Sequence, residues 1–218
     1  MKTKMYKLLV AIAFMVCGAS HSYGQDYYTP GQTIVGDGFT YIYELDTYMS
    51  EYGLTPSPIT LRLQDIGNIL SDHIPLQANG KHIPFINPPK SYASGDAFPL
   101  ICNIFASVLS AEDRRAIQNN QTYPRPEMLI MRLYINSQTG RVMEVVFSFN
   151  SQANGFINLA PEKYHQIETM MKEQLVFQIN DIGRTYNFNL ATIPFRSQDI
   201  GVTYDFDRKV WNEPDLRP

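Results

Sequence analysis

The chain has 218 residues and a formal net charge of −3, from 18 Lys and Arg against 21 Asp and Glu. An acidic balance disfavours nucleic-acid binding, because phosphate backbones require clustered basic side chains. The length allows a hydrophobic core in one domain or in two small ones.

Residues 1–24 have the pattern of a secretory signal peptide. Lys2, Lys4 and Lys7 precede the apolar run "LLVAIAFMV", which is too short to span a bilayer. A small-x-small sequence ends this segment and predicts cleavage before Gln25, with export to the periplasm or beyond it. The exported chain would then carry 15 basic and 21 acidic side chains, a net charge of −6.

The two cysteines bear on lipidation and on disulfide bonding. Cys17 does not fit a lipoprotein signal, because Val16 stands where that pattern has a small residue. After cleavage Cys102 is the remaining cysteine, so no intramolecular disulfide is expected. It lies in the apolar sequence "FPLICNIF", where a thiol behaves as a small core residue. No later stretch is long and apolar enough to predict a transmembrane segment in the mature chain.

The first predicted half of the mature chain, residues 25–126, is rich in strand patterns. Alternating apolar residues predict strands over 39–45 and 59–66. Residues 87–96 are dense in Pro and Gly, which predicts a surface loop.

A helix is predicted at the end of this half. Ser110 followed by Asp113 resembles a capping box, and the acidic first turn favours a helix that continues to about Asn119. The apolar run before it, residues 100–108, fits a buried strand or a helix equally well by its period.

The second predicted half, residues 127–218, contains the sequence "MRLYINSQTGRVMEVVFSF" at residues 131–149. Its alternation on both sides of Gly140 predicts a β-hairpin, and glycine there supplies the positive φ of a short loop. The predicted apolar face comprises Leu129, Met131, Leu133, Ile135, Met143, Val145, Phe147 and Phe149.

A helix that starts at Pro161 is expected to cover this apolar face. Glu168 and Lys172 are predicted to form an i,i+4 pair on its outer side. Alternation then predicts strands over 184–193 and 199–206. The expected fold class is α+β: an antiparallel sheet with one or two helices packed on one face.

Residues 128–190 resemble the C-terminal domain of TonB-type energy-transducing proteins, in which a hairpin is followed by a helix and a closing strand. The matching positions in the hairpin are Asn136, Gly140, Val142 and Val145. This resemblance implies docking onto a partner by strand contact. The whole chain also resembles the small secreted proteins of unknown function from Gram-negative gut bacteria, a resemblance that implies no activity.

Motifs that would indicate an enzyme are absent from the sequence. It has no H-E-x-x-H zinc motif, no G-x-S-x-G nucleophile turn and no phosphate-binding glycine loop. The stretch "DFDRKVWNE" begins like a calcium loop, but Lys209 and Val210 stand where an oxygen ligand and a glycine are required. We therefore predict a non-catalytic protein without a cofactor or metal.

The favoured function is interaction with an envelope protein by β-augmentation. The predicted edge strand is "RTYNFNLATI", with Tyr186, Asn187, Phe188 and Asn189 as candidate contact residues. Asn187 and Asn189 are expected to face away from its apolar side.

Two other functions stay open on the sequence alone. A binding protein for a polar small molecule or glycan would use exposed rings such as Tyr27, Tyr28 and Tyr92 as stacking surfaces. A hydrolase, the less favoured alternative, would need His73, His82 and carboxylates close together in one cleft.

Overall fold

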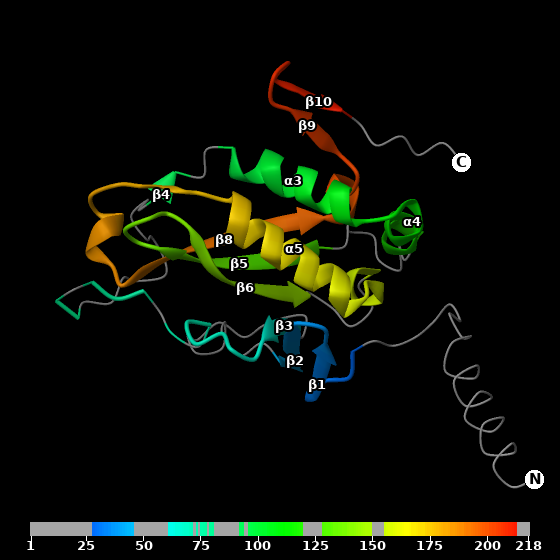
Figure 1. The fold of residues 1–218 in the computed structure, drawn as a ribbon, viewed down its shortest axis with the longest axis horizontal. Helices are drawn as coiled ribbons and strands as arrows, with labels where there is room; N and C mark the ends of the chain where they lie inside the picture. Colours follow the sequence, from blue (N-terminus) through cyan, green and yellow to red (C-terminus); the bar gives the residue numbers. More distant parts are fainter. Residues whose placement is uncertain are drawn as a thin grey trace, which may run out of the picture.

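A six-stranded antiparallel sheet forms the centre of the computed structural model (Figure 1), which describes residues 28–45, 61–71, 73, 75–77, 79–80, 92–93, 96–119, 128–149 and 155–212. In spatial order the strands are β1 (Gln32–Gly36), β2 (Phe39–Leu45), β3 (Leu61–Asp65), β6 (Val142–Phe149), β5 (Met128–Asn136) and β8 (Phe188–Arg196). The predicted α+β class is confirmed. Strands from both predicted halves of the chain belong to this one sheet.

Two helices pack on one face of the sheet, α3 (Ala97–Val108) and α5 (Pro161–Gln174). A third helix, α4 (Ala111–Asn119), begins at the predicted capping box. The Ser110 amide donates to Asp113 Oδ2 at 2.7 Å, and the Asp113 amide donates back to Ser110 Oγ at 3.1 Å. The apolar run at residues 100–108, whose period fitted a strand or a helix, belongs to α3 and is helical.

Short elements complete the described structure: β4 (Tyr92–Ala93), η1 (Gly155–Asn158), β7 (Gln178–Ile179), η2 (Gly183–Thr185), η3 (Ser197–Asp199), β9 (Thr203–Asp205) and β10 (Val210–Asn212). The strand predicted over 199–206 is wrong in its first half, which is taken up by η3 and a turn. The β9–β10 hairpin lies on the far side of α3 from the sheet (Figure 1).

The β5–β6 hairpin forms as predicted, with Gly140 at a φ of +72°. A side chain at Gly140 would meet the Phe177 carbonyl oxygen at 2.0 Å, so glycine is required here for space as well. A bulge beside Tyr134 shifts the register, and Ile135 pairs with Val142. Met143 consequently packs on the opposite face from Val145, which corrects its predicted position.

The two faces of the sheet are filled differently. The helix face carries the main core, in which Leu133, Phe147 and Phe195 are fully buried beneath α3 and α5. The second face, on the other side of the sheet, holds a small apolar cluster of Tyr134, Val146 and Phe188.

Cys102 lies in the main core, as predicted from its apolar neighbours. Burial, followed by the nearby charge of Asp199, raises the pKa of its thiol to about 12. Within the described part of the chain, no helix has the length and apolar character needed to cross a membrane.

Candidate functional site

The outer edge of β8 is the first candidate site, because β8 is the last strand of the sheet and pairs with β5 on its inner side. Three even-numbered residues of β8 show which of its backbone N–H groups point away from β5. Phe188 N–H donates to the Asn187 side chain, Arg196 N–H donates to Asp199 Oδ2, and Pro194 has no N–H. These residues therefore direct their backbone groups away from β5.

Alternation along the strand gives Leu190 and Thr192 the same outward direction. Among the described residues, no group accepts their N–H groups and none donates to the carbonyl oxygens of Leu190, Thr192 and Pro194. Thr192 and Pro194 are exposed and Leu190 is half-buried. An open stretch of strand backbone thus runs from residue 190 to residue 194.

Both ends of this open stretch are closed. At its beginning, Asn187 N–H donates to the Leu76 carbonyl oxygen at 2.9 Å, and Leu76 N–H donates to Asn187 Oδ1 at 2.8 Å. At its end, Asp199 Oδ2 accepts from the Arg196 amide at 2.8 Å. The available edge is therefore shorter than β8 itself.

The four residues predicted to make contact with a partner lie before the open stretch, and three of them are buried. Tyr186 accepts from Gln77 Nε2 at 3.2 Å, and Phe188 packs on Tyr134 in the second-face cluster. Asn187 is exposed but already bonded to Leu76. The open backbone at residues 190–194 begins directly after these four residues.

Asn189 was expected to face away from the apolar side of the strand, and this prediction is wrong. It pairs with Ile135 on the helix face and is buried. Its Nδ2 donates to Ser137 Oγ at 2.9 Å and to the Gly183 carbonyl oxygen at 3.1 Å. Asn189 therefore fixes the turn before β8 to the β5–β6 loop, which is a structural role.

Among the other predicted residues, the structure describes His73 and Tyr92, which make no contact with each other. His73 is exposed, and His82 lies outside the described residues together with Tyr27. Tyr92 of β4 packs edge-on against Phe177, and burial raises its pKa. In the described segments no three His, Cys, Asp or Glu side chains form a group that could hold a metal.

Tyr28 is also unavailable as a stacking surface. It is buried in the main core, and its hydroxyl donates to the Leu159 carbonyl oxygen at 2.6 Å. Its ring packs against Tyr43, with 5.2 Å between the centroids. Of the three rings suggested for glycan binding, Tyr28 and Tyr92 are therefore packed within the domain, and Tyr27 lies outside the described residues.

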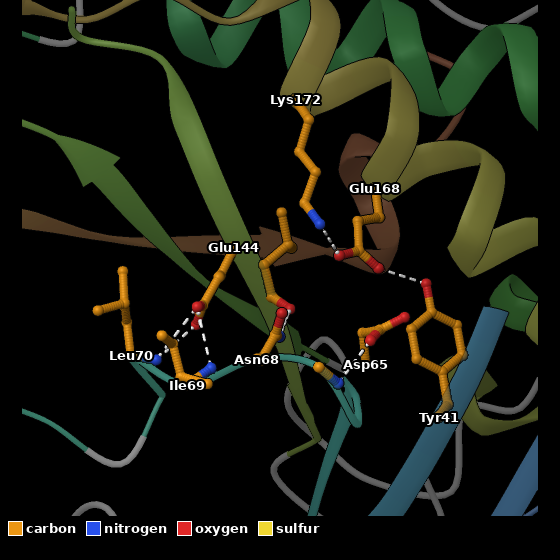
Figure 2. A network of polar contacts seen from close by, with 10 residues as sticks. Tyr41, Asp65, Asn68, Ile69, Leu70, Glu144, Glu168 and Lys172 are labelled. Carbon is orange, nitrogen blue, oxygen red and sulfur yellow. Dashed lines mark hydrogen bonds and ion pairs between the residues drawn. The ribbon is translucent and has the colours of Figure 1, made fainter.

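A buried polar network links α5 to β2. The Tyr41 hydroxyl donates to Glu168 Oε2, and Lys172 Nζ lies 2.6 Å from Glu168 Oε1; Figure 2 shows Glu168 between the two partners. The ion pair was predicted, but its outer position was wrong, because Glu168 is only 3% exposed. Burial, and then the charge and hydrogen bond of Glu168, raise the pKa of Tyr41 far above its ordinary value.

On the second face, Glu144 anchors the chain that follows β3. Its Oε1 accepts from the Ile69 amide at 2.9 Å, and its Oε2 accepts from the Leu70 amide at 2.9 Å (Figure 2). Asn68 Nδ2 donates to the Val145 carbonyl oxygen at 3.0 Å. These contacts hold residues 68–70 against the sheet, and the bonds to buried carboxylate are the strong, charge-assisted kind.

A shallow groove of about 610 Å³ lies where α3 meets α5. Ser107 and Val108 line one side, and Lys163, His165, Gln166 and Thr169 line the other. Lys163 Nζ is already engaged, since it donates to the Val108 carbonyl oxygen at 3.0 Å and lies 3.7 Å from Asp113 Oδ2. His165 stacks on Phe39, with 4.8 Å between ring centroids.

Comparison with known proteins finds similarity to a family without an assigned function. A family model described as a domain of unknown function, DUF5043, matches residues 103–193. The matched segment includes the β5–β6 hairpin, α5 and most of β8.

A crystal structure of a DUF5043 family protein from Bacteroides uniformis has a similar fold, with a TM-score of 0.61 and 20% sequence identity. The similarity covers 82% of this chain and 98% of that chain. At this identity the likeness concerns the fold alone. A search of curated proteins finds no match. The resemblance of residues 128–190 to TonB C-terminal domains stays a prediction.

Proposed function

We propose that this protein is an exported, non-catalytic interaction module that accepts an extended segment of a partner protein on the outer edge of β8. The observation that carries the proposal is the open backbone at residues 190–194, where outward N–H and carbonyl groups have no partner among the described residues. An added antiparallel strand would satisfy these groups by β-augmentation.

The closed ends define what can dock. A partner strand has room for about five residues between the Leu76 contact and the Asp199 side chain, and Pro194 offers an acceptor but no donor. Each backbone hydrogen bond contributes a net of about 1 kcal/mol, so the backbone alone supports only weak binding. Side-chain contacts with Thr192 and Pro194 on the second face would supply the remaining affinity and the selectivity.

The same features explain why such an edge is compatible with a soluble fold. Unprotected edge strands pair with one another and aggregate, and proline is one of the devices that natural sheets use against this. Here Pro194 and the two closed ends prevent long pairing but leave the stretch at residues 190–194 open. The edge therefore favours a short partner segment over a second long strand.

Two sequence features support the location and the mode of action. The signal-peptide pattern of residues 1–24 predicts export, which would place the domain among envelope or extracellular partners. The TonB-type resemblance implies docking by strand contact. Export is tested by recovering the protein from the periplasmic fraction of its host and measuring its mass. The mass should correspond to a chain that begins at Gln25.

The docking proposal is tested with two substitutions at one exposed position. Thr192→Pro removes one outward N–H and leaves the ladder with β5 intact, whereas Thr192→Val changes the side chain and keeps the N–H. Heptapeptides selected from a random display library on the mature chain should bind the wild type and Thr192→Val alike. Thr192→Pro should weaken their binding about tenfold, or about 1.4 kcal/mol.

Circular dichroism and the melting temperature establish that both variants keep the sheet. Binding of a selected peptide should also slow hydrogen exchange at the Leu190 and Thr192 amides. Peptides that bind Thr192→Pro as tightly as the wild type, without protection of these two amides, would show that β8 is not the docking strand.

A further inference from the structure

The β9–β10 hairpin carries an exposed aromatic cluster on one of its sides. Tyr204 and Trp211 are directly paired across the two strands, and Phe206 follows Tyr204 at the start of the loop. Phe206 is 40% exposed and Trp211 is 47% exposed. These rings are exposed beside one another, whereas an exposed apolar side chain that stands alone is ordinary. We refer to Tyr204, Phe206 and Trp211 as the aromatic face.

The hairpin is firmly attached to the domain. Asn103 of α3 binds β9 with both ends of its side-chain amide: Nδ2 donates to the Tyr204 carbonyl oxygen at 2.8 Å, and Oδ1 accepts from the Tyr204 amide at 2.7 Å. The ring of Phe98 on α3 lies 6.3 Å from that of Trp211. The aromatic face is therefore fixed in place before any ligand arrives, which lowers the entropy cost of binding.

The loop is also ordered by local contacts. Asp205 Oδ1 accepts from the Asp207 amide at 3.0 Å and from the Arg208 amide at 2.9 Å, the pattern of an Asx turn. Lys209 has a φ of +57°, the left-handed conformation that closes a hairpin loop of this length. The aspartate that resembled the first ligand of a calcium loop thus shapes the turn that carries Phe206.

The rings meet at steep angles. Tyr204 makes edge contacts with Phe206 and with Trp211, each with 5.0 Å between centroids and interplanar angles of 80° and 62°. Phe206 and Trp211 therefore each contact Tyr204, and no ring contact between the two is found in the described residues. Such an arrangement suits a ligand with more than one flat apolar surface.

The size of the aromatic face argues against a protein partner. A fully exposed aromatic side chain offers about 150–250 Å², so the exposed parts of Phe206 and Trp211 amount to about 200 Å². A specific protein interface takes about 800 Å² from each partner. A small ligand matches the available surface better.

The net charge of the hairpin indicates whether a charged or a neutral small ligand fits the aromatic face. Residues 203–212 contain two aspartates, one arginine and one lysine, so their formal charges cancel. Anionic polymers and anionic membrane surfaces are bound by clusters of positive charge, which this hairpin does not have. A neutral ligand is therefore favoured.

We infer that the aromatic face binds a neutral glycan. A pyranose ring has a face of C–H groups that packs on the electron-rich face of an aromatic ring, and hydroxyl groups around its rim. The side chain of Asp207 has no partner among the described residues, and Arg208 is 83% exposed although its Nε lies 3.6 Å from Asp205 Oδ2. Both are polar groups of the loop that carries Phe206 and are available to sugar hydroxyls. This site is separate from the β8 edge and goes beyond the proposed docking function.

Trp211 is the only tryptophan in the sequence, so its fluorescence reports directly on this site. The mature chain is applied to a printed array of neutral and anionic glycans, and the neutral glycan that binds best is then titrated while Trp211 fluorescence is recorded. We expect neutral glycans to bind and the emission to shift. Trp211→Ala should weaken binding at least about tenfold, which is about 1.4 kcal/mol, and Phe206→Ala should weaken it to a smaller extent.

Val210→Ala is the matched control. Val210 is equally exposed on the same short strand but pairs with Asp205, away from the aromatic face, so glycan binding should be unchanged. Asn103→Ala keeps every ring but loosens the attachment of the hairpin, and it should weaken binding several-fold. Thr192→Pro should have no effect, which separates this site from the β8 edge.

Three results would overturn the inference. One is a wild-type array signal for neutral glycans no higher than that of Trp211→Ala. Another is binding confined to anionic glycans or to phosphatidylglycerol vesicles. The third is neutral-glycan binding that leaves the Trp211 emission unchanged and survives Trp211→Ala.

Discussion

The two faces of the sheet bury side chains of different kinds. On the helix face, residues such as Leu133, Phe147 and Phe195 pack beneath two helices in one continuous apolar core. On the second face, the apolar cluster around Tyr134 and Phe188 is small, and its neighbours include the buried carboxylate of Glu144.

This difference separates two tasks. Apolar burial on the helix face supplies most of the stability, because the free energy scales with the apolar area removed from water. The second face instead uses hydrogen bonds to hold the chain after β3 against the sheet, as Glu144 does with Ile69 and Leu70. The sheet thus has one face for stability and another for placing an irregular segment.

The largest expected loss of stability comes from replacing phenylalanine by alanine on each face of β8, which tests this difference between the two faces. Phe195→Ala should lower the free energy of unfolding by about 4–5 kcal/mol, because Phe98, Phe105 and Phe156 surround the cavity that it leaves. Phe188→Ala should lower it by about 3 kcal/mol, since the smaller cluster can relax around the cavity. Urea unfolding with a common m-value measures both.

Equal losses for the two alanine variants would contradict the division between the faces. A greater loss for Phe188→Ala would reverse it and would make the second face the main source of stability. A changed m-value in either variant would indicate an altered unfolded or native state, and the comparison would then be repeated with Phe→Leu at both positions.

A smaller effect is expected on the second face at Glu144. Glu144→Gln removes the negative charge and places an NH₂ group where one oxygen accepts from the Leu70 amide. Hydrogen bonds to charged groups contribute about 1.5–3 kcal/mol, so we expect a loss of about 2 kcal/mol. Hydrogen exchange at the Ile69 and Leu70 amides should accelerate, while the amides of β5 keep their protection relative to global unfolding.

Glu173→Gln is the control for the loss of one negative charge, because Glu173 is exposed on α5. It should change the stability by less than about 0.5 kcal/mol. If Glu144→Gln changed neither stability nor exchange at residues 69 and 70, the carboxylate would not be the anchor of that segment.

Sequence periodicity predicts an element well where one face is buried and local signals agree. The β5–β6 hairpin combines strict alternation with a glycine at its turn, and α4 begins at a capping box whose two residues are three positions apart. The hairpin joins two segments that are adjacent in the sequence, and the capping box joins residues three positions apart. Patterns of this kind need no knowledge of the rest of the fold.

The errors arose where distant contacts decide. Glu168 and Lys172 look like a solvated pair on a helix, but the partner that buries Glu168 is Tyr41, which lies 127 positions away in the sequence. In β8 the alternation through Phe188 points to one face, while Ala191 and Phe195 occupy the other. Both faces are apolar there, so period two cannot tell which one carries the main core.

The candidate sites were predictable to different degrees. The sequence predicts β8 as an edge strand from Asn187 and Asn189, but Asn187 is bonded to Leu76 and Asn189 is buried. The open stretch itself depends on contacts from Leu76 and Asp199. The aromatic face could have been found from the alternation of Tyr204 and Phe206 and the nearby Trp211. The resemblance of the same stretch to an incomplete calcium loop concealed it.

The smallest expected effect concerns the network that joins the helix face to α5. Tyr41→Phe removes the hydroxyl that donates to Glu168 but leaves the Lys172 ion pair. We expect a loss of about 1 kcal/mol at neutral pH, the net contribution of one hydrogen bond. Urea unfolding at pH 7 measures it, and an unchanged free energy of unfolding would contradict a stabilising role for this bond.

The pH dependence of the stability of Tyr41→Phe tests the ionisation of Tyr41 directly. Burial raises the pKa values of Tyr41, Tyr43 and Tyr164 in the folded state, that of Tyr43 to about 12, from an ordinary value of 10.0. Above pH 10 the unfolded chain therefore loses protons that the folded chain keeps, and stability falls as the pH rises. Each such tyrosine contributes up to about 1.4 kcal/mol per pH unit in that range. Tyr41→Phe should make this decline less steep, and an unchanged slope between pH 10 and pH 11 would show that Tyr41 ionises with equal ease in both states.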